Sequence, residues 1–296
     1  NVIFGENAQG KTNLLEAIRS LINDKRDWAD SRLLRALCDG EAYAVPRLGD
    51  EETVDKLQAL KVYTQYRDLI STAPLEIIYS GSADLERVKQ ALAAAFATLP
   101  REEVRVISTA APHVCRESVQ HVEDVLDVTQ GKLGMGFSCG SDDMPALLMG
   151  NTLFGGSSNS KLFLNVREKL SLCYYASSLY HRQKGLITVS SGIEFQNYQR
   201  AYDEIMAQLE AVQKGELEDW ELEGARSTLL NSYATVGDSQ GKLENFYLGQ
   251  AATGQHETPA DLARAIQDMT AERICRAMST VKLDTVYFLK GKEAEA

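Results

Sequence analysis

The first residues of the chain contain a pattern that could bind nucleotide phosphates. Residues 5–12 read GENAQGKT and fit the phosphate-loop pattern G-x-x-x-x-G-K-[ST] at every position. In such a loop backbone N–H groups surround phosphate oxygens, a lysine reaches the outer phosphates and a hydroxyl holds magnesium. Gly10, Lys11 and Thr12 are therefore candidate nucleotide-binding residues.

The rest of the chain gives this loop little support. A phosphate-loop ATPase needs a carboxylate at the end of a second apolar strand to hold magnesium. The candidate strands are Leu75–Tyr79, Val104–Ile107 and Val286–Leu289, and they are followed by Ser, Ser and Lys. The wording GENAQGKTNLLEAI resembles RecF-type recombination ATPases, but that resemblance stops near Ile18. We interpret residues 1–14 as a short RecF-like segment at a fusion junction, and a DNA-repair ATPase stays the rival hypothesis.

A second stretch, residues 153–175, reads LFGGSSNSKLFLNVREKLSLCYY. It resembles the second domain of pitrilysin/insulinase-type zinc peptidases, whose pattern is G-G-x-x-S-x-L-F-x-x-(L/V)-R-E-K-x-x-L-A-Y. The resemblance implies that Arg167 and Tyr174 bind substrate, by holding the peptide backbone and the developing oxyanion. The structural alternative is that Arg167 caps a helix and Tyr174 belongs to a core strand. Ser158 or Ser160 would cap the helix that follows the glycines.

The same resemblance implies a zinc site of the form H-x-x-E-H, with a glutamate that activates water. None of the four histidines, at positions 113, 121, 181 and 256, begins or ends that motif. By the internal repeat described below, the family's metal helix corresponds to residues 147–154, where Leu147, Gly150 and Asn151 replace the ligands and the base. We therefore predict no catalytic residue and no metal in this chain, and zinc only in a partner.

The predicted partner is a zinc-bearing peptidase-family paralogue, and the predicted substrate is a peptide or protein. A scaffold that has lost peptide binding is the third hypothesis. His113, Cys115, His121 and Glu123 could be imagined as a separate metal cluster, but their place around an interdomain linker favours solvated, unrelated side chains.

The elements that would position these residues show an internal repeat. Four segments recur in order at an offset of 208–210 residues: 17–23 with 225–231, 30–31 with 238–239, 54–70 with 263–279, and 75–79 with 285–289. The segments of the first and third pairs predict helices, and those of the fourth pair predict strands. Each segment of the second pair is followed by a further helix.

The second unit carries additional elements ahead of its repeated part. We predict strands at 122–128, 131–139, 173–180 and 186–193, and helices at 144–153, 161–170 and 198–213. Gly131, Gly134 and Gly136 indicate a strand with close neighbours, since no helix follows in a dinucleotide-binding pattern.

These elements predict an α+β fold, and the resemblance implies metallopeptidase-type (LuxS/MPP-like) domains with an antiparallel sheet packed by helices. We expect two copies of one peptidase-like domain. The first copy, at 15–112, is truncated and consists only of the C-terminal part of the domain. A complete domain without zinc follows at 113–296.

Composition excludes several classes of protein. The net charge is −11, and Lys and Arg are scattered among acids without a basic stripe, which disfavours nucleic-acid binding. No apolar run reaches the length that a bilayer needs, so we expect no membrane partner. The five cysteines are widely spaced and odd in number, which indicates reduced thiols and a cytoplasmic protein.

Overall fold

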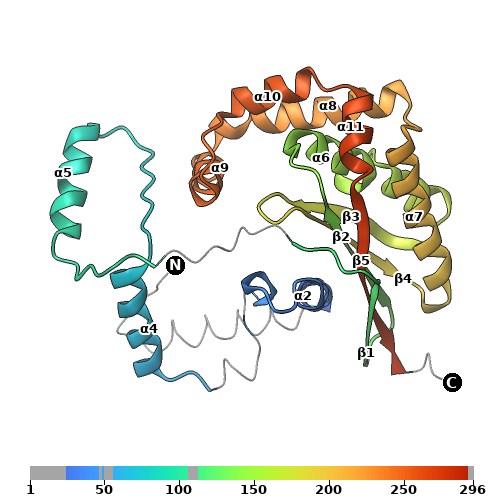
Figure 1. Ribbon diagram of the computed structural model, residues 1–296, viewed down its shortest axis with the longest axis horizontal. Helices are drawn as coiled ribbons and strands as arrows, with labels where there is room; N and C mark the ends of the chain where they lie inside the picture. The colour runs from blue at the N-terminus through green and yellow to red at the C-terminus, as the bar shows by residue number, and fades with distance from the viewer. Residues whose placement is uncertain (1–24, 47–48, 50–55, 106–112, 293–296) are drawn as a thin grey trace.

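The computed structural model in Figure 1 describes residues 25–46, 49, 56–105 and 113–292. Its centre is a sheet whose strand order is β1-β5-β2-β4-β3. The strands are β1 (Gln120–Leu126), β2 (Gly131–Cys139), β3 (Cys173–His181), β4 (Leu186–Ile193) and β5 (Val281–Gly291). The four strands predicted ahead of the repeat are confirmed within two residues at each end, and so is the α+β fold class.

The sheet is mixed, whereas we expected an antiparallel sheet. The difference lies at the edge strand β1, which pairs parallel to β5. β5 pairs antiparallel with β2 but parallel with β1, with Gln120 opposite Thr285. β1 and β2 follow each other through a short turn and run in opposite directions. A strand inserted between them must therefore be parallel to one and antiparallel to the other.

Helices cover one face of the sheet (Figure 1). They are α6 (Met144–Asn151), α7 (Tyr198–Lys214), α8 (Asp219–Ala234), α10 (Pro259–Gln267) and α11 (Ala271–Met278), with π-helical turns η2 (Thr152–Gly156) and η3 (Leu162–Lys169) and short 3₁₀ turns η4 (Phe195–Asn197) and η5 (Val236–Asp238). Helix α9 (Gln240–Thr253) packs on η5 and lies to one side of the sheet in Figure 1. The buried side chains of β2, such as Met135 and Phe137, join this layer in one apolar core. The predicted helices at 144–153, 161–170 and 198–213 are confirmed, the second as a π-helix.

Helix α2 (Lys25–Leu37) covers the opposite face and leads into the turn η1 (Ala42–Ala44). Its buried Leu33 packs with Tyr287 and Leu289 of β5. A Cβ added at Gly136 would lie 2.7 Å from Cδ2 of Leu37, so the glycine allows the helix to approach the strand. The interpretation of β2 as a strand with close neighbours is therefore confirmed.

Helices α4 (Ala59–Thr72) and α5 (Leu85–Phe96) are set apart from the sheet in Figure 1. Between them, residues 75–79 form no strand, contrary to prediction, and residues 104–105 have no regular structure either. An extended segment becomes a strand only when a neighbour satisfies its backbone groups. No described strand lies beside this one, and the side chains of Leu60 and Ile77 are 74% and 50% exposed.

The repeat is reproduced only in part. Asp30 and Ser31 lie inside α2, whereas Ser239 accepts a hydrogen bond from the Lys242 N–H and caps α9. Asp30 instead accepts a hydrogen bond from Ser190 on β4, so packing on the sheet decides the local structure. Residues 17–23 lie outside the described residues, and the domain boundaries at 15, 112 and 113 stay predictions.

The described helices include none that is both long enough and apolar enough to cross a membrane.

Candidate functional site

Arg167 lies on η3, whose buried Leu162 and Val166 face the core. Ser160 precedes this turn and accepts a hydrogen bond from the Phe163 N–H at 3.4 Å, the capping role expected of it. The guanidinium of Arg167 lies 4.7 Å from the centre of the Phe163 ring, and its Nε is 3.6 Å from a carboxylate oxygen of Glu168. The side chain is 41% exposed, so its charge faces solvent.

Tyr174 lies at an irregularity in the outer strand β3. Cys173 pairs with Ile193 and Tyr175 with Gly192, so Tyr174 is the extra residue of a bulge. Its ring is 61% exposed, and its hydroxyl donates to Oε1 of Glu194 at 2.5 Å. This hydrogen bond raises the pKa of the Tyr174 phenol. Tyr174 is therefore not a core residue of the strand.

Arg167 and Tyr174 belong to the same end of the sheet domain. The chain turns sharply between η3 and β3 at Ser171, whose φ of 48° is a left-handed conformation. Burial raises the pKa of the Cys173 thiol, and a hydrogen bond to Ser191 and the charge of Arg167 partly oppose this. The positive charge of Arg167 thus lowers the pKa of the Cys173 thiol, and Cys173 directly precedes Tyr174.

The positions that would correspond to zinc ligands are part of the core. Leu147 and Gly150 are buried in α6, and a Cβ on Gly150 would lie 2.4 Å from the Met278 side chain. Asn151 is 5% exposed, and its Oδ1 accepts a hydrogen bond from Ser178 at 2.7 Å. These residues offer neither a ligand set nor an opening to solvent, so they do not fit a zinc ion.

The candidate nucleotide residues Gly10, Lys11 and Thr12 lie outside the described residues, and nucleotide binding stays a prediction.

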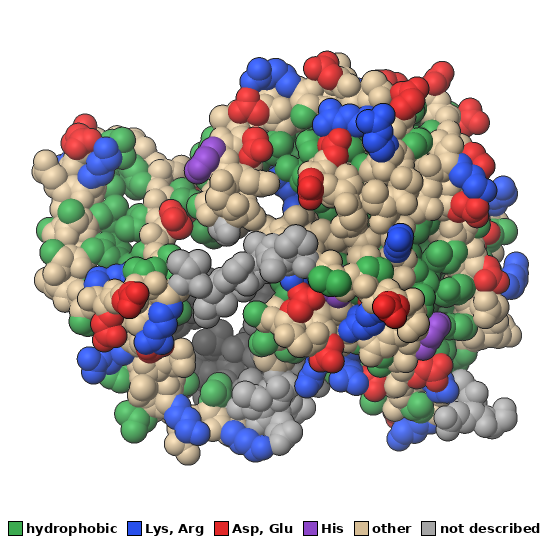
Figure 2. All heavy atoms as spheres, in the orientation of Figure 1, with side chains coloured by type: hydrophobic (Ala, Val, Ile, Leu, Met, Phe, Trp, Pro, Cys, Tyr) green, Lys and Arg blue, Asp and Glu red, His purple; other side chains and the backbone are tan. Residues whose placement is uncertain are grey.

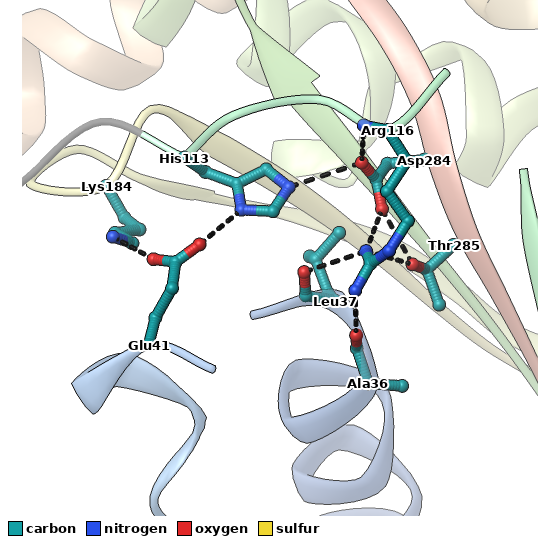
Figure 3. Close-up of polar contacts among 8 residues, drawn as sticks. All are labelled: Ala36, Leu37, Glu41, His113, Arg116, Lys184, Asp284 and Thr285. Atoms are coloured by element: carbon teal, nitrogen blue, oxygen red, sulfur yellow. Dashed lines mark hydrogen bonds and ion pairs between the residues drawn. The ribbon is translucent and has the colours of Figure 1, made fainter. Parts of the chain in front are cut away.

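A polar cluster joins α2, the segment after residue 112 and β5 (Figure 3). Asp284 is fully buried and accepts hydrogen bonds from Nε2 of His113 at 3.2 Å and from Nη1 of Arg116 at 2.6 Å. Arg116 also donates to the carbonyl oxygens of Ala36 and Leu37 at the end of α2. Burial alone would raise the pKa of Asp284, but hydrogen bonds from the Arg116 N–H, the Thr285 hydroxyl, and the His113 and Arg116 side chains hold it below its ordinary value.

This cluster contains the group of residues in the described chain that could hold a metal. One ligand atom each of Cys38, Glu41 and His113 lies within 4.8 Å of the others. The Glu41 carboxylate, however, already lies 2.7 Å from His113 Nδ1 and forms an ion pair with Lys184. Burial also raises the pKa of the Cys38 thiol to about 12, which disfavours the thiolate that a metal needs. We interpret the cluster as a set of structural contacts that hold the end of α2 and the segment after residue 112 against β5.

The separately imagined quartet is not brought together as a metal site. His113 turns to Glu41 and Asp284, whereas Glu123 on β1 pairs with Lys290 at 3.0 Å.

Comparison with known proteins decides the family. Residues 56–229 match the family model described as "Peptidase M16 inactive domain". The chain is 36% identical over 293 residues to the probable inactive metalloprotease YmfF of Bacillus subtilis, covering 97% of this chain and 68% of that protein. The chain belongs to the M16 peptidase family. Within that family it is an inactive, peptidase-like protein, in agreement with the core packing of α6.

Two further proteins are similar to the chain. The solved peptidase M16 inactive domain from Pseudomonas fluorescens superposes with a TM-score of 0.75 at 17% identity, over 96% of this chain and 70% of that chain, and shows the shared fold. An uncharacterized zinc protease of Bacillus subtilis, YmxG, is 23% identical over 154 residues, which are 50% of this chain and 38% of that protein.

The M16 resemblance did not indicate Glu194, which holds the Tyr174 hydroxyl. A signal was available in the sequence. If the strands at 173–180 and 186–193 form a hairpin, Glu194 must follow the residue opposite the start of the first strand. The bulge that turns Tyr174 toward it could not be read from the pattern.

Proposed function

We propose that this M16 protein is the catalytically incomplete member of a pair, and that it presents Arg167 and Tyr174 to the peptide substrate of a zinc-bearing paralogue. The observation that carries the proposal is the exposure of both groups at one end of the sheet domain. A core tyrosine would be buried, whereas an exposed side chain is accessible to a substrate. Here Arg167 is 41% and Tyr174 61% exposed.

The chemistry suits peptide cleavage in which the partner supplies the activated water. A guanidinium and a phenol O–H both donate hydrogen bonds to a carbonyl oxygen or to an oxyanion. Tyr174 would have to exchange its bond to Glu194 for one to the substrate. Two solvent-exposed groups can make this exchange without disturbing the core.

The existence of a zinc-bearing partner is supported by the relatives. Bacillus subtilis encodes both YmfF, named as probably inactive, and YmxG, named as a zinc protease. An inactive and a zinc-dependent member of the family therefore coexist in one bacterium, as the proposed pairing requires.

The test combines the protein with the zinc-bearing paralogue from its own genome. Peptide turnover and the association constant of the pair are measured for the parent and for the variants Arg167→Ala and Tyr174→Phe. Loss of one donor to a developing oxyanion typically lowers the rate on the order of 10²–10³-fold, so we expect at least a tenfold loss of turnover with unchanged association.

Arg200→Ala and Tyr247→Phe, both at exposed positions outside the site, are the matched controls. Unchanged turnover of Arg167→Ala and Tyr174→Phe in an intact pair would leave the scaffold hypothesis instead. A parent pair that does not associate or does not cleave would contradict the partnership itself.

A further inference from the structure

A polar pocket lies between the β3–β4 turn and helix α9, at the opposite end of β3 from Tyr174. It has a volume of about 320 Å³, at the lower end of the range for small-molecule sites. Figure 2 shows the surface hollowed beside α9, in the region where Figure 1 places the β3–β4 turn opposite that helix. The turn contributes Arg182 and Gln183, and α9 contributes most of the opposite wall.

The pocket carries one positive charge and no negative charge. Its lining residues are Arg182, Gln183, Asn245, Phe246, Gly249, Gln250, Thr253 and Gln255. Within the described part of the chain, Arg182 has no hydrogen bond or ion pair. A positive charge without a carboxylate beside it is notable in a chain of net charge −11, and it favours an anionic ligand.

A second observation points to a ligand that also carries a hydrogen-bonding group. Gln250 is only 4% exposed, and its Oε1 has no hydrogen-bond partner among the described residues. A buried polar atom without a partner costs free energy, whereas a ligand N–H would satisfy it. The neighbouring Gln255 already accepts from the Thr253 hydroxyl at 3.2 Å, whereas the buried Oε1 of Gln250 accepts no hydrogen bond from the described residues.

We propose that this pocket binds a carboxylate attached to a peptide, with the carboxylate on Arg182 and a peptide N–H donated to Gln250. Arginine binds a planar carboxylate through two parallel N–H···O bonds, and the unpartnered Oε1 of Gln250 favours an anion that carries a peptide N–H over a free phosphate. The side-chain amides of Gln183 and Asn245 can both donate to and accept from peptide groups. Phe246 supplies an apolar wall for a neighbouring side chain.

The carboxylate can come from the C-terminus of a peptide or from an acidic side chain, and both present the same chemistry to Arg182. This site shares peptide recognition with the proposed function but not its residues. Variants of Arg167 and Tyr174 should leave binding here unchanged, so the two proposals fail separately.

The experiment is isothermal titration calorimetry with the 296-residue chain. The probes are acetyl-Ala-Ala with a free C-terminal carboxylate, the same peptide as its amide, acetyl-Ala-Asp-amide and inorganic phosphate. We expect one of the two carboxylate peptides to bind at least tenfold more tightly than acetyl-Ala-Ala-amide, and the tighter one identifies the source of the carboxylate.

Arg182→Gln removes the charge but keeps an amide, and it should weaken binding about tenfold or more. Gln250→Met removes the acceptor while it keeps the volume and should also weaken binding, and Arg200→Gln is the charge-matched control outside the pocket. The proposal would be overturned if neither carboxylate peptide bound more tightly than acetyl-Ala-Ala-amide. Tighter binding of phosphate, no binding at all, or an unchanged affinity of Arg182→Gln would each overturn it as well. Because Arg182 is partly exposed, its variant remains informative if Gln250→Met does not fold.

Discussion

His181 is expected to make the stability of the protein depend on pH between pH 7.5 and pH 5. The ring lies at the end of β3, where Nδ1 is 2.9 Å from the Tyr43 hydroxyl and Nε2 is 3.0 Å from Oγ1 of Thr188. The edge of the ring also meets Tyr43 at 6.0 Å between centres. Burial disfavours the charged ring and lowers the pKa of His181 from 6.5 to about 4.

The direction in which stability changes with pH depends on whether the folded or the unfolded chain binds the proton at His181. Between the two pKa values the unfolded chain is protonated at this histidine and the folded chain is not, so lower pH favours unfolding. The stabilisation by the neutral ring is fully present above pH 6.5 and is lost as the pH falls toward 4. With a folded pKa of about 4 and an unfolded pKa of 6.5, the loss between pH 7.5 and pH 5 is ~2 kcal/mol.

The assay is urea unfolding followed by tryptophan fluorescence, because Trp28 on α2 packs edge-on against Tyr287 of the sheet. The free energy of unfolding is compared at pH 7.5 and pH 5 for the parent, His181→Gln and the exposed-histidine control His256→Gln. His181→Gln should reduce the difference between the two pH values by ~2 kcal/mol, whatever its effect at pH 7.5. An unchanged difference would refute the reasoning, as would an equal reduction in the control.

Three further outcomes are expected. Lys161→Met should destabilise the fold by about 3–5 kcal/mol in urea unfolding, because the buried Glu221 carboxylate loses the ammonium group that lies 3.0 Å from it. Adding Glu221→Gln should restore part of this free energy of unfolding. Gly150→Ala should cost about 1–3 kcal/mol in the same assay, because the new methyl group meets Met278, and no loss would show that the core yields there. Metal analysis after dialysis should find no stoichiometric zinc, whereas one zinc per chain, removed by Cys38→Ser, would show that the cluster at Cys38 holds metal.

The sequence predicted the elements whose patterns are repeated over many residues. The hairpin of β3 and β4 and the amphipathic α7 were placed within about a residue, because each has a long buried stripe that belongs to one core. The spacing of Arg167 and Tyr174 was likewise readable, since both sit in a dense local motif.

The failures have a common physical origin in contacts between distant segments. Residues 75–79 have the apolar composition of a strand, but strand formation needs a pairing neighbour that composition does not report. His113 was grouped with residues near it in sequence, whereas its ring contacts Glu41 and Asp284, 72 and 171 residues away. The hydroxyl of Tyr174 was assigned to substrate without Glu194, since the bulge depends on how β3 meets β4.

The packing of α6 bears on whether this M16 fold could regain a metal site by substitution. A histidine at position 150 would extend into Met278 and Ile274 of α11, because even a Cβ there lies 2.4 Å from the methionine side chain. A histidine at 151 would lose the hydrogen bond between Asn151 and Ser178 and leave that buried hydroxyl without its Oδ1 acceptor. The missing ligands are therefore replaced by contacts that join α6 to α11 and to β3. Simple reversal of the side chains would destabilise the core before it created a site, which is why we expect activity to depend on a partner.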